Sequence, residues 1–209
     1  GRVMVQGEGA ALVVDLLDAE PGATVLDLCA APGTKARAIA HRMQGEGRVW
    51  ANDHSTKRLQ ALQDTPGAPA IIETHTADAR TLTPEDAPTP THIVLDVPCT
   101  GTGVLGRRAD LRWRRTPSDV QELVALQDEL LDAAARLVPP EAILVYSTCS
   151  LLPQENEERV QAFLDRHADF EVAPPTGIPD DVQRDGYLYA DPAAHGTDGA
   201  FGARLRRTA

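Results

Sequence analysis

The chain has 209 residues, 42% of them hydrophobic and 24% charged, and its formal net charge is −11. This is the composition of a soluble globular protein, and no apolar stretch is long enough to cross a membrane. The acidic balance argues against nucleic acid as a partner unless basic residues cluster locally. Three cysteines do not make a disulfide framework and favour a reducing, cytoplasmic location.

Apolar runs alternate with helical patterns along the chain, which is typical of a parallel sheet covered by helices. We predict strands at Thr24–Leu28, Arg48–Asn52, Ala70–Thr74, His92–Val97, Ala142–Ser147 and Phe201–Arg207. Helices are predicted over Gly9–Ala19, Gly33–Met43, Thr56–Gln63, Pro117–Val138 and Gln154–Arg166. No internal repeat or linker divides the chain, so we expect one α/β domain over residues 1–209.

Two of the predicted helices carry clear terminal signals. Thr116 and Asp119 resemble a capping box around Pro117, which suits the first helical position. Glu155 is expected in the opening turns of the last helix, where an acid suits the positive end of the helix dipole. The residues from 174 to 197 are rich in Pro, Gly and Asp and predict irregular structure.

Candidate ligand-binding residues follow three predicted strands. Small residues and Gly33 come after the first strand and let the backbone pass close to a ligand as a helix starts. Asp53 ends the second strand about 20 residues later, where Rossmann-like sheets place an acid that holds ribose hydroxyls. Asp78 follows the third strand. A turn or helix cap explains each acid alone, but together they predict a site at the carboxyl edge of the sheet.

The stretch Gly101–Gly106 matches the G-x-G-x-x-G fingerprint of dinucleotide-binding proteins. That fingerprint also needs a helix to open at the glycines and an acid at the end of the next strand. An arginine-rich stretch follows instead, without a strand pattern before Pro117. We therefore expect a flexible glycine loop beside Cys99, and a nicotinamide-dependent dehydrogenase is a less favoured alternative.

Cys99 and Cys149 each stand just past an apolar run that predicts a strand. Parallel strands end at one edge of a sheet, so both thiols and Asp96 are expected there. A thiolate adds to an electron-poor carbon, but little of an ordinary thiol is ionised at neutral pH, so the site has to activate it. A buried structural role is the alternative for either thiol and the favoured one for Cys29.

Basic residues form two further features. Lys35 lies near a predicted helix start, where the helix dipole disfavours a cation, so we expect an anion beside it, such as Asp27 or a ligand carboxylate. A cluster of arginines can follow phosphates, although composition alone favours their pairing with the chain's many carboxylates. The arginines of this cluster are Arg107, Arg108, Arg112, Arg114 and Arg115.

Three segments resemble the motifs of one enzyme family: Asp27–Lys35, Asp96–Gly103 and Tyr146–Ser150. The chain is similar to the Sun-type RNA cytosine-5 methyltransferases, which include bacterial enzymes that act on 16S ribosomal RNA. The resemblance covers nearly the whole chain, from Gly1–Gln6 to His195–Phe201. The order of a Pro-Cys pair followed by a Thr-Cys pair is highly specific to this family.

The resemblance implies an α/β, Rossmann-like methyltransferase fold with a mostly parallel seven-stranded sheet flanked by helices. It implies methylation of carbon 5 of a cytosine in RNA through a covalent cysteine adduct, with 16S ribosomal RNA favoured over transfer RNA. Relatives carry an N-terminal RNA-binding domain that we expect this chain to lack. No metal, membrane or obligate protein partner is expected.

The resemblance also implies roles for individual residues. Cys149 is the nucleophile, Cys99 assists product release, and Asp96 lies between the cofactor's methionine end and the target base. Asp53 holds the ribose of S-adenosyl-L-methionine and Asp78 lies by its adenine. A cradle for this cofactor is formed by Cys29, Ala30, Ala31, Pro32, Gly33, Thr34 and Lys35, and the arginine cluster binds RNA.

Elementary chemistry agrees with these roles. Attack of a thiolate on carbon 6 makes carbon 5 of cytosine nucleophilic, and the proton on carbon 5 must later be removed before the cysteine leaves. A second thiol can act as that base, and a proton on Asp96 can stabilise charge on the ring. A non-catalytic RNA-binding or assembly module on the same fold is the stronger of the two alternatives. The enzyme is favoured because no chemical group is missing.

Overall fold

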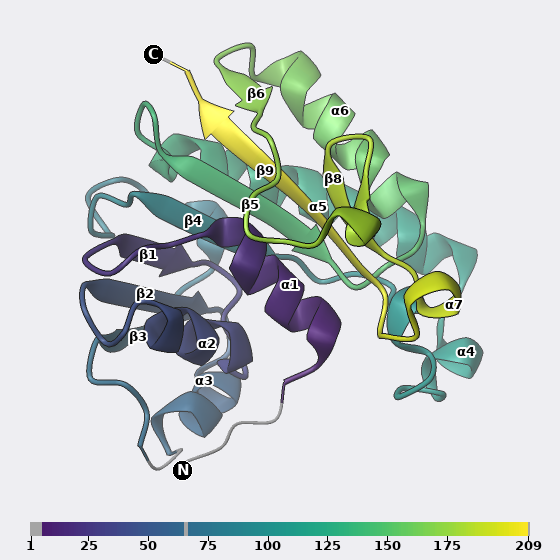
Figure 1. Cartoon of the computed structure of the whole chain (residues 1–209), viewed down its shortest axis with the longest axis horizontal. Coiled ribbons are helices and arrows are strands. Elements are labelled where there is room, and N and C mark those ends of the chain that lie inside the picture. The colour runs from purple at the N-terminus through teal and green to yellow at the C-terminus, as the bar shows by residue number, and fades with distance from the viewer. Residues whose placement is uncertain (1–5, 65–66, 209) are drawn as a thin grey trace.

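The computed structural model describes residues 6–64 and 67–208, where one sheet of nine strands separates two layers of helices (Figure 1). The strands are β1 (Thr24–Asp27), β2 (Arg48–Asp53), β3 (Ile72–Thr76), β4 (His92–Asp96), β5 (Ile143–Thr148), β6 (Phe170–Val172), β7 (Gln183–Arg184), β8 (Tyr187–Ala190) and β9 (Ala200–Arg207). The helices are α1 (Glu8–Leu17), α2 (Thr34–Arg42), α3 (Thr56–Gln63), α4 (Leu111–Arg114), α5 (Pro117–Leu137), α6 (Glu157–Arg166) and α7 (Pro192–His195).

The first five strands are parallel and lie in the order β3-β2-β1-β4-β5. Their carboxyl ends therefore share one edge, and the strand order reverses direction between β1 and β4, where ligands bind in open α/β sheets. On the far side of β5, β9 pairs antiparallel and begins at that same edge, since Phe201 is paired with Thr148. The chain just before β9 is thus brought to the ends of β4 and β5.

Two hydrophobic cores form because both faces of the sheet are covered. Successive strand residues point to opposite faces. On β1, Val25 packs with the core of α1, α2 and α3, whereas Leu26 packs with that of α5 and α6. Burial on both faces explains why the central strands read as unbroken apolar runs.

The fold class and the predicted order of strands and helices are confirmed, with differences in detail. The third strand starts at Ile72 rather than Ala70. The last long helix starts at Glu157, because Pro153–Glu155 form a separate 3₁₀ turn. At the start of α5, the backbone N–H of Thr116 donates to Asp119 as the capping box requires.

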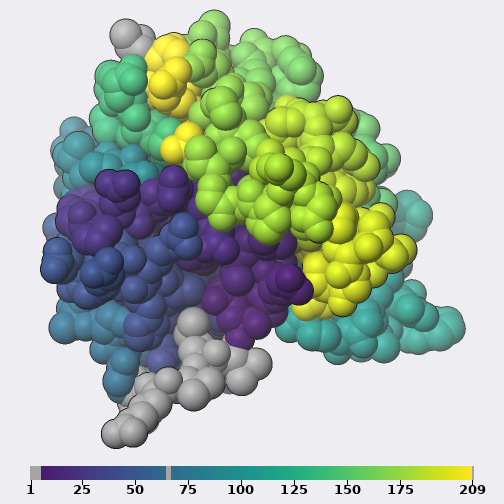
Figure 2. Space-filling view, in the orientation of Figure 1, coloured from purple at the N-terminus to yellow at the C-terminus, as the bar shows by residue number. Residues whose placement is uncertain are grey.

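The sheet has nine strands in the described residues rather than the expected seven. Residues 174–197 were expected to be irregular, yet they include β7, β8 and α7. The cause is tertiary: β8 pairs with β9, and Leu188 of β8 is fully buried in the core beside α1. Figure 2 shows this yellow-green segment lying directly against the purple α1.

Among the described residues, no helix combines the length and the apolar character that a membrane span needs. The first part of the family resemblance, Gly1–Val5, lies outside the described residues.

Candidate active site

The carboxyl edge of the sheet gathers the residues that the sequence singled out. Asp27, Asp53 and Asp96 are the last residues of β1, β2 and β4. Cys149 directly follows β5, and Asp78 lies two residues past β3. Because β1 and β4 are neighbours, the site forms at the reversal point of the strand order.

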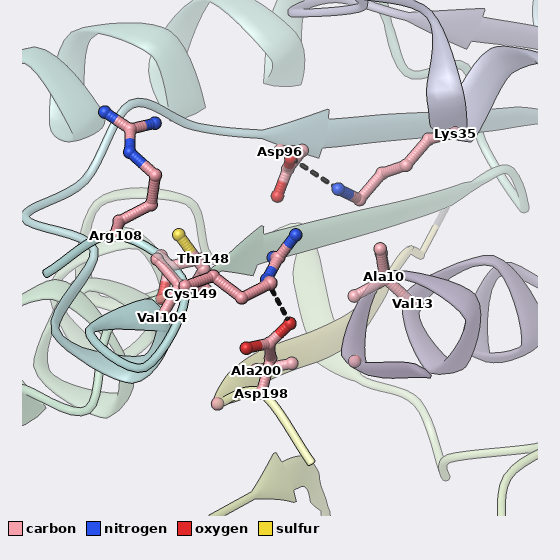
Figure 3. A pocket seen from close by; sticks show the side chains of 13 residues that line it. Ala10, Val13, Lys35, Asp96, Val104, Arg108, Thr148, Cys149, Asp198 and Ala200 are labelled. Carbon is pink, nitrogen blue, oxygen red and sulfur yellow. Dashed lines mark hydrogen bonds and ion pairs between the residues drawn. The ribbon is translucent and has the colours of Figure 1, made fainter. Parts of the chain in front are cut away.

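Lys35 and Asp96 form an ion pair at the centre of the site. Lys35 Nζ donates to Asp96 Oδ2 at 2.6 Å, and Ser147 Oγ donates to Asp96 Oδ1 at 2.9 Å. Burial by itself would lower the pKa of Lys35, but Asp96 and Asp27 outweigh it and raise that pKa. The sequence suggested Asp27 as the anion beside Lys35, whereas the direct partner is Asp96 (Figure 3).

Asp27 is a buried acid with only 1% of its surface exposed. Burial raises its pKa to about 7, although the nearby charge of Lys35 acts in the opposite direction. Neither side-chain oxygen has a well-aligned hydrogen-bond partner in the described part of the chain, although the Cys29 amide is near enough to lower the pKa. A buried polar group without a partner is costly, so Asp27 is suited to a ligand that brings a donor.

The two thiols are in direct contact. Cys99 Sγ and Cys149 Sγ lie 3.3 Å apart, and both side chains are half-buried. We assign the proton between them to Cys99: the hydrogen bond with Cys149, reinforced by burial, raises the pKa of Cys99 well above its usual value. The same hydrogen bond lowers the pKa of Cys149, assisted by the charge of Lys35 and opposed by burial and Asp96. Cys149 is therefore the more acidic of the two thiols.

Three adjoining clefts open at this edge. The Cys149 cleft, of about 280 Å³, is lined by Cys149, Thr148, Arg108 and Asp198. The Ala31 cleft, of about 220 Å³, is lined by Asp27 and by Cys29–Pro32. Lys35 and Asp96 line both of these clefts, so the ion pair stands between them.

The third cleft, the Asp53 cleft of about 190 Å³, is lined by Asp53, Asp78 and Leu28 and shares Cys29 with the Ala31 cleft. Asp53 accepts hydrogen bonds from the amides of Ala31 at 3.1 Å and Ser55 at 2.9 Å. A carboxylate has about four acceptor positions, so it can also accept from ligand hydroxyls. Asp78 is more exposed, and its hydrogen bond to Arg80 lowers its pKa.

Gly33 is required in the loop between β1 and α2, at the point where the chain enters the helix. Its φ is +99°, in the left-handed region, and a Cβ there would lie 2.6 Å from Leu62 Cδ1. The residues of the loop, from Cys29 through Thr34, all lie along the Ala31 cleft except Gly33. Gly33 thus shapes the loop from behind rather than lining the cleft.

The glycine stretch Gly101–Gly106 forms a loop, as predicted, but a packed one. Gly103 N donates to the carbonyl of Cys149 at 2.9 Å, and a Cβ on Gly103 would lie 2.8 Å from that oxygen. A 3₁₀ turn, Thr102–Val104, lies within the stretch, α4 follows it, and no strand lies between the glycines and α5. The loop therefore supports the Cys149 turn and lacks the strand and helix that a dinucleotide fingerprint needs.

The predicted RNA-binding arginines divide into three groups. Arg107 pairs with Asp198, while Arg108 and Arg114 pair with Asp110, as the alternative interpretation anticipated. Arg115 is exposed but donates to the carbonyls of Thr100 at 3.0 Å and Cys99 at 3.1 Å. Arg112 is exposed on α4, which projects from the body at the edge of the molecule (Figure 2).

Sequence reasoning missed three residues at this site. Trp113 on α4 is 90% exposed, which is rare for so large an apolar side chain, and its place among arginines was the available signal. Glu155 and Asn156 are fully buried and bind the two cysteine turns. Glu155 was expected to serve the dipole of a helix, and nothing in the local pattern distinguishes it from its exposed neighbour Glu158.

Comparison with known proteins adds independent findings. A family model described as 16S rRNA methyltransferase RsmB/F matches residues 14–206. The chain is 39% identical to a probable ribosomal RNA small subunit methyltransferase B of Synechocystis sp., over 97% of this chain and 47% of the relative. It is 37% identical to the corresponding probable enzyme of Bacillus subtilis, over 99% of this chain and 48% of the relative.

Two solved structures are also similar. The crystal structure of PH0851 matches with a TM-score of 0.91 and 37% identity, over 98% of this chain and 47% of that one. NSun6 from Pyrococcus horikoshii, solved with SFG, matches with a TM-score of 0.86 and 26% identity, over 98% of this chain and 53% of that one. The chain thus spans about half the length of these relatives.

Proposed function

Because the chain belongs to the 16S rRNA methyltransferase RsmB/F family, we propose that it transfers a methyl group from S-adenosylmethionine to carbon 5 of a cytosine in 16S ribosomal RNA. The family membership confirms the resemblance drawn from the sequence motifs. The observation that carries the proposal is the sulfur pair, in which Cys149 lines a cleft with Asp96 while touching Cys99 at 3.3 Å. A thiolate with a thiol beside it is what addition to carbon 6 and later proton removal at carbon 5 require.

The Ala31 and Asp53 clefts fit the proposed cofactor. When bound, S-adenosylmethionine supplies a methyl group on a positively charged sulfur. Asp27 is buried without a well-aligned hydrogen-bond partner in the described residues, and it lines the Ala31 cleft, where its free acceptor oxygens suit the ammonium group of this ligand. Asp53 would accept from the ribose hydroxyls, and Asp78 at the other side of the Asp53 cleft would lie by the adenine.

The proposed reaction starts at Cys149. Its thiolate forms a bond to carbon 6 of the cytosine, and the electrons of the carbon 5–carbon 6 double bond move into the ring and make carbon 5 nucleophilic. Asp96, fixed by Lys35 and Ser147, lines the Cys149 cleft. The proton that it shares with Lys35 passes to the ring nitrogen of the amidine edge and balances the negative charge that attack by the thiolate creates.

Release of the product needs a base at carbon 5. Once Cys149 is bonded to carbon 6, the hydrogen bond that most raised the pKa of Cys99 is gone, and Cys99 can lose its proton to solvent. After carbon 5 has gained the methyl group, the Cys99 thiolate takes the proton from carbon 5. The electron pair of that C–H bond restores the double bond, the bond to sulfur breaks, and Cys149 leaves as a thiolate. A contact of 3.3 Å between the sulfurs supports this role, because Cys99 is then beside any adduct on Cys149.

We also propose that α4 presents RNA-binding side chains beside the active site. Leu111 of α4 is buried, and Arg115, which directly follows α4, binds the carbonyl of Cys99. Arg112 and Trp113 are left exposed between these two anchors. An exposed indole next to a guanidinium is suited to stacking on a base and contacting the adjacent phosphate.

The deciding experiment is methylation of unmodified 16S ribosomal RNA by the purified chain, followed by mapping of the modified nucleotide. The proposal expects 5-methylcytosine at a defined position, and transfer RNA serves as the competing substrate. Binding of RNA and S-adenosylmethionine without turnover would instead identify a non-catalytic module on the same fold. Modification of a different base or atom would reject the assigned chemistry.

A further inference from the structure

Two consecutive residues between β5 and α6 are buried although both are polar. Glu155 and Asn156 each have 0% of their surface exposed. Among the described residues, Glu155 forms no ion pair with Lys, Arg or His. A carboxylate is costly to bury without a cation, so its hydrogen bonds have to compensate for the lost hydration.

Glu155 binds the turn that carries Cys99. Its Oε1 accepts from the Thr100 amide at 2.9 Å and from Gln127 Nε2 at 3.0 Å, and its Oε2 accepts from the Thr100 hydroxyl. Gln127 also donates to the carbonyl of Pro98 at 2.9 Å. Cys99 is thereby fixed at the residue before it and at the residue after it.

Asn156 binds the turn that carries Cys149 in the same manner. Its Oδ1 accepts from the Thr148 hydroxyl at 2.6 Å, and its Nδ2 donates to the Ser150 carbonyl at 3.0 Å. Within the turn, the Ser150 amide donates to Thr148 Oγ1 at 3.0 Å. Cys149 is therefore also held from both sides.

The two turns share one anchor because Glu155 and Asn156 are adjacent in the chain. Tyr146 of β5 donates its hydroxyl to the Glu155 carbonyl at 2.6 Å, which ties the pair to the central sheet. The hydroxyls of Thr100 and Ser150 also meet at 3.2 Å. The position of one sulfur relative to the other is thus determined largely by this buried pair.

We propose that Glu155 and Asn156 are positioning residues that set the distance between Cys99 and Cys149, and that the charge of Glu155 keeps the shared proton on Cys99. The second part rests on the proposed function, in which Cys149 is the nucleophile. It agrees with the pKa of Cys99, which is raised by the hydrogen bond with Cys149, by burial and by the charge of Cys149, and further by the charge of Glu155. The other charged or titratable groups that face the sulfurs are Asp96, Lys35, Tyr146 and Arg115.

The first test measures geometry with a reagent that links two neighbouring thiols, dibromobimane, followed by mapping of the linked peptides. Glu155→Gln should link Cys99 to Cys149 at close to the wild-type rate, because a glutamine still accepts from the Thr100 amide and its nitrogen can donate to the Thr100 hydroxyl. Glu155→Ala should slow the reaction by about tenfold, since it removes a buried hydrogen-bonded anchor. Asn156→Ala should also slow the linking reaction, because it removes the anchor of the turn that carries Cys149.

The second test measures the proton. The protein is treated with less than one equivalent of iodoacetamide, and the ratio of label on Cys149 to label on Cys99 is determined by peptide mass spectrometry. Glu155→Gln should reduce this ratio, by about tenfold for each unit by which the pKa values of the two thiols move closer together. Glu158→Gln removes a charge from the exposed part of the same segment and should leave the ratio unchanged.

Neither test needs RNA or cofactor, so failure of the positioning proposal can be distinguished from failure of the proposed function. Absence of methylation by the wild-type chain would reject the proposed function and leave the positioning role standing. A wild-type labelling ratio in Glu155→Gln would overturn the electrostatic part, and wild-type linking in both alanine variants would overturn the geometric part. If the alanine variants do not fold, as judged by circular dichroism, the linking rate of Glu155→Asp, whose side chain is one methylene shorter, tests the geometric part, and a wild-type rate in that variant would overturn it. In an active enzyme, Glu155→Gln should lower kcat while KM for RNA stays constant.

Discussion

The turns that follow β4 and β5 each carry a cysteine just past the end of the strand, yet the surroundings of the two thiols differ. Asp96 is paired with Ser147 across the two strands, so Cys99 and Cys149 extend past neighbouring ends of the sheet. The pKa of Cys99 is raised and that of Cys149 is lowered. The Cys99 turn is enclosed by Glu155, Gln127 and Arg115, whereas Cys149 opens onto a cleft that also holds Lys35. Two equal thiols thus become different through their surroundings.

The sharpest way to break this comparison is to remove each thiol in turn. Cys149→Ser should abolish methyl transfer, because a serine hydroxyl is not ionised at neutral pH. Cys99→Ala should instead leave RNA attached to Cys149, since the base that completes the reaction is gone. Denaturing gel electrophoresis with labelled RNA distinguishes the two outcomes. Equal, modest losses from both substitutions without an adduct would contradict the assigned roles.

Asp27 extends the comparison, because like Cys99 it is a buried group that keeps its proton to a higher pH than usual. Its pKa rises from 3.8 to about 7 on folding, so its protonated form stabilises the fold below about pH 4 and that contribution is lost as pH rises through 7. In the wild type this effect lowers the free energy of unfolding by up to about 4 kcal/mol as pH rises between these limits, and Asp27→Asn should lack that decrease.

Urea unfolding of the wild type and of Asp27→Asn across this range measures that difference. Glu85→Gln, at an exposed carboxylate, serves as the control variant. A parallel pH dependence in wild type and Asp27→Asn would show that the buried acid does not couple to folding.

Substitution of Lys35 tests why Cys149 is the more acidic of the two thiols. Lys35→Met removes a cation that lowers the pKa of Cys149 and leaves the opposing charge of Asp96 in place. The rise of iodoacetamide reactivity with pH should move to higher pH, and the rate at neutral pH should fall about tenfold for each unit of pKa change. Lys57→Met, on the exposed surface of α3, should have no effect. An unchanged Cys149 profile would assign the asymmetry to the sulfur contact and Glu155 alone.

The smallest effect separates two arginines that the sequence grouped together. Arg112→Ala should weaken RNA binding and reduce the slope of log affinity against log salt by about one, as loss of a phosphate contact does, without altering the linking of the two thiols. Arg115→Ala should slow that linking, because it frees the carbonyls of Cys99 and Thr100. Filter binding at several salt concentrations and dibromobimane linking measure the two effects. Identical behaviour of both variants would remove the distinction.

Much of this molecule was predictable from the chain alone. Apolar periodicity located the strands and helices, because a strand buried on both faces and an amphipathic helix each leave a local pattern. The parallel connections then placed Asp27, Asp53, Asp96 and Cys149 at one edge, since topology fixes where strands end. The roles of these residues in catalysis and cofactor binding stay predictions.

Other features depended on contacts between distant parts of the chain. Lys35 pairs with Asp96 rather than Asp27, and Arg115 donates to the Cys99 carbonyl. Strand β8 forms because it pairs with β9. Glu155 reads in the sequence as one acid among several at a helix start, yet it lies buried against the Cys99 turn. The sequence by itself determined which groups reach the site. Only the tertiary structure decided which thiol holds the proton, because pKa values depend on burial and on charges a few ångströms away that local pattern does not encode.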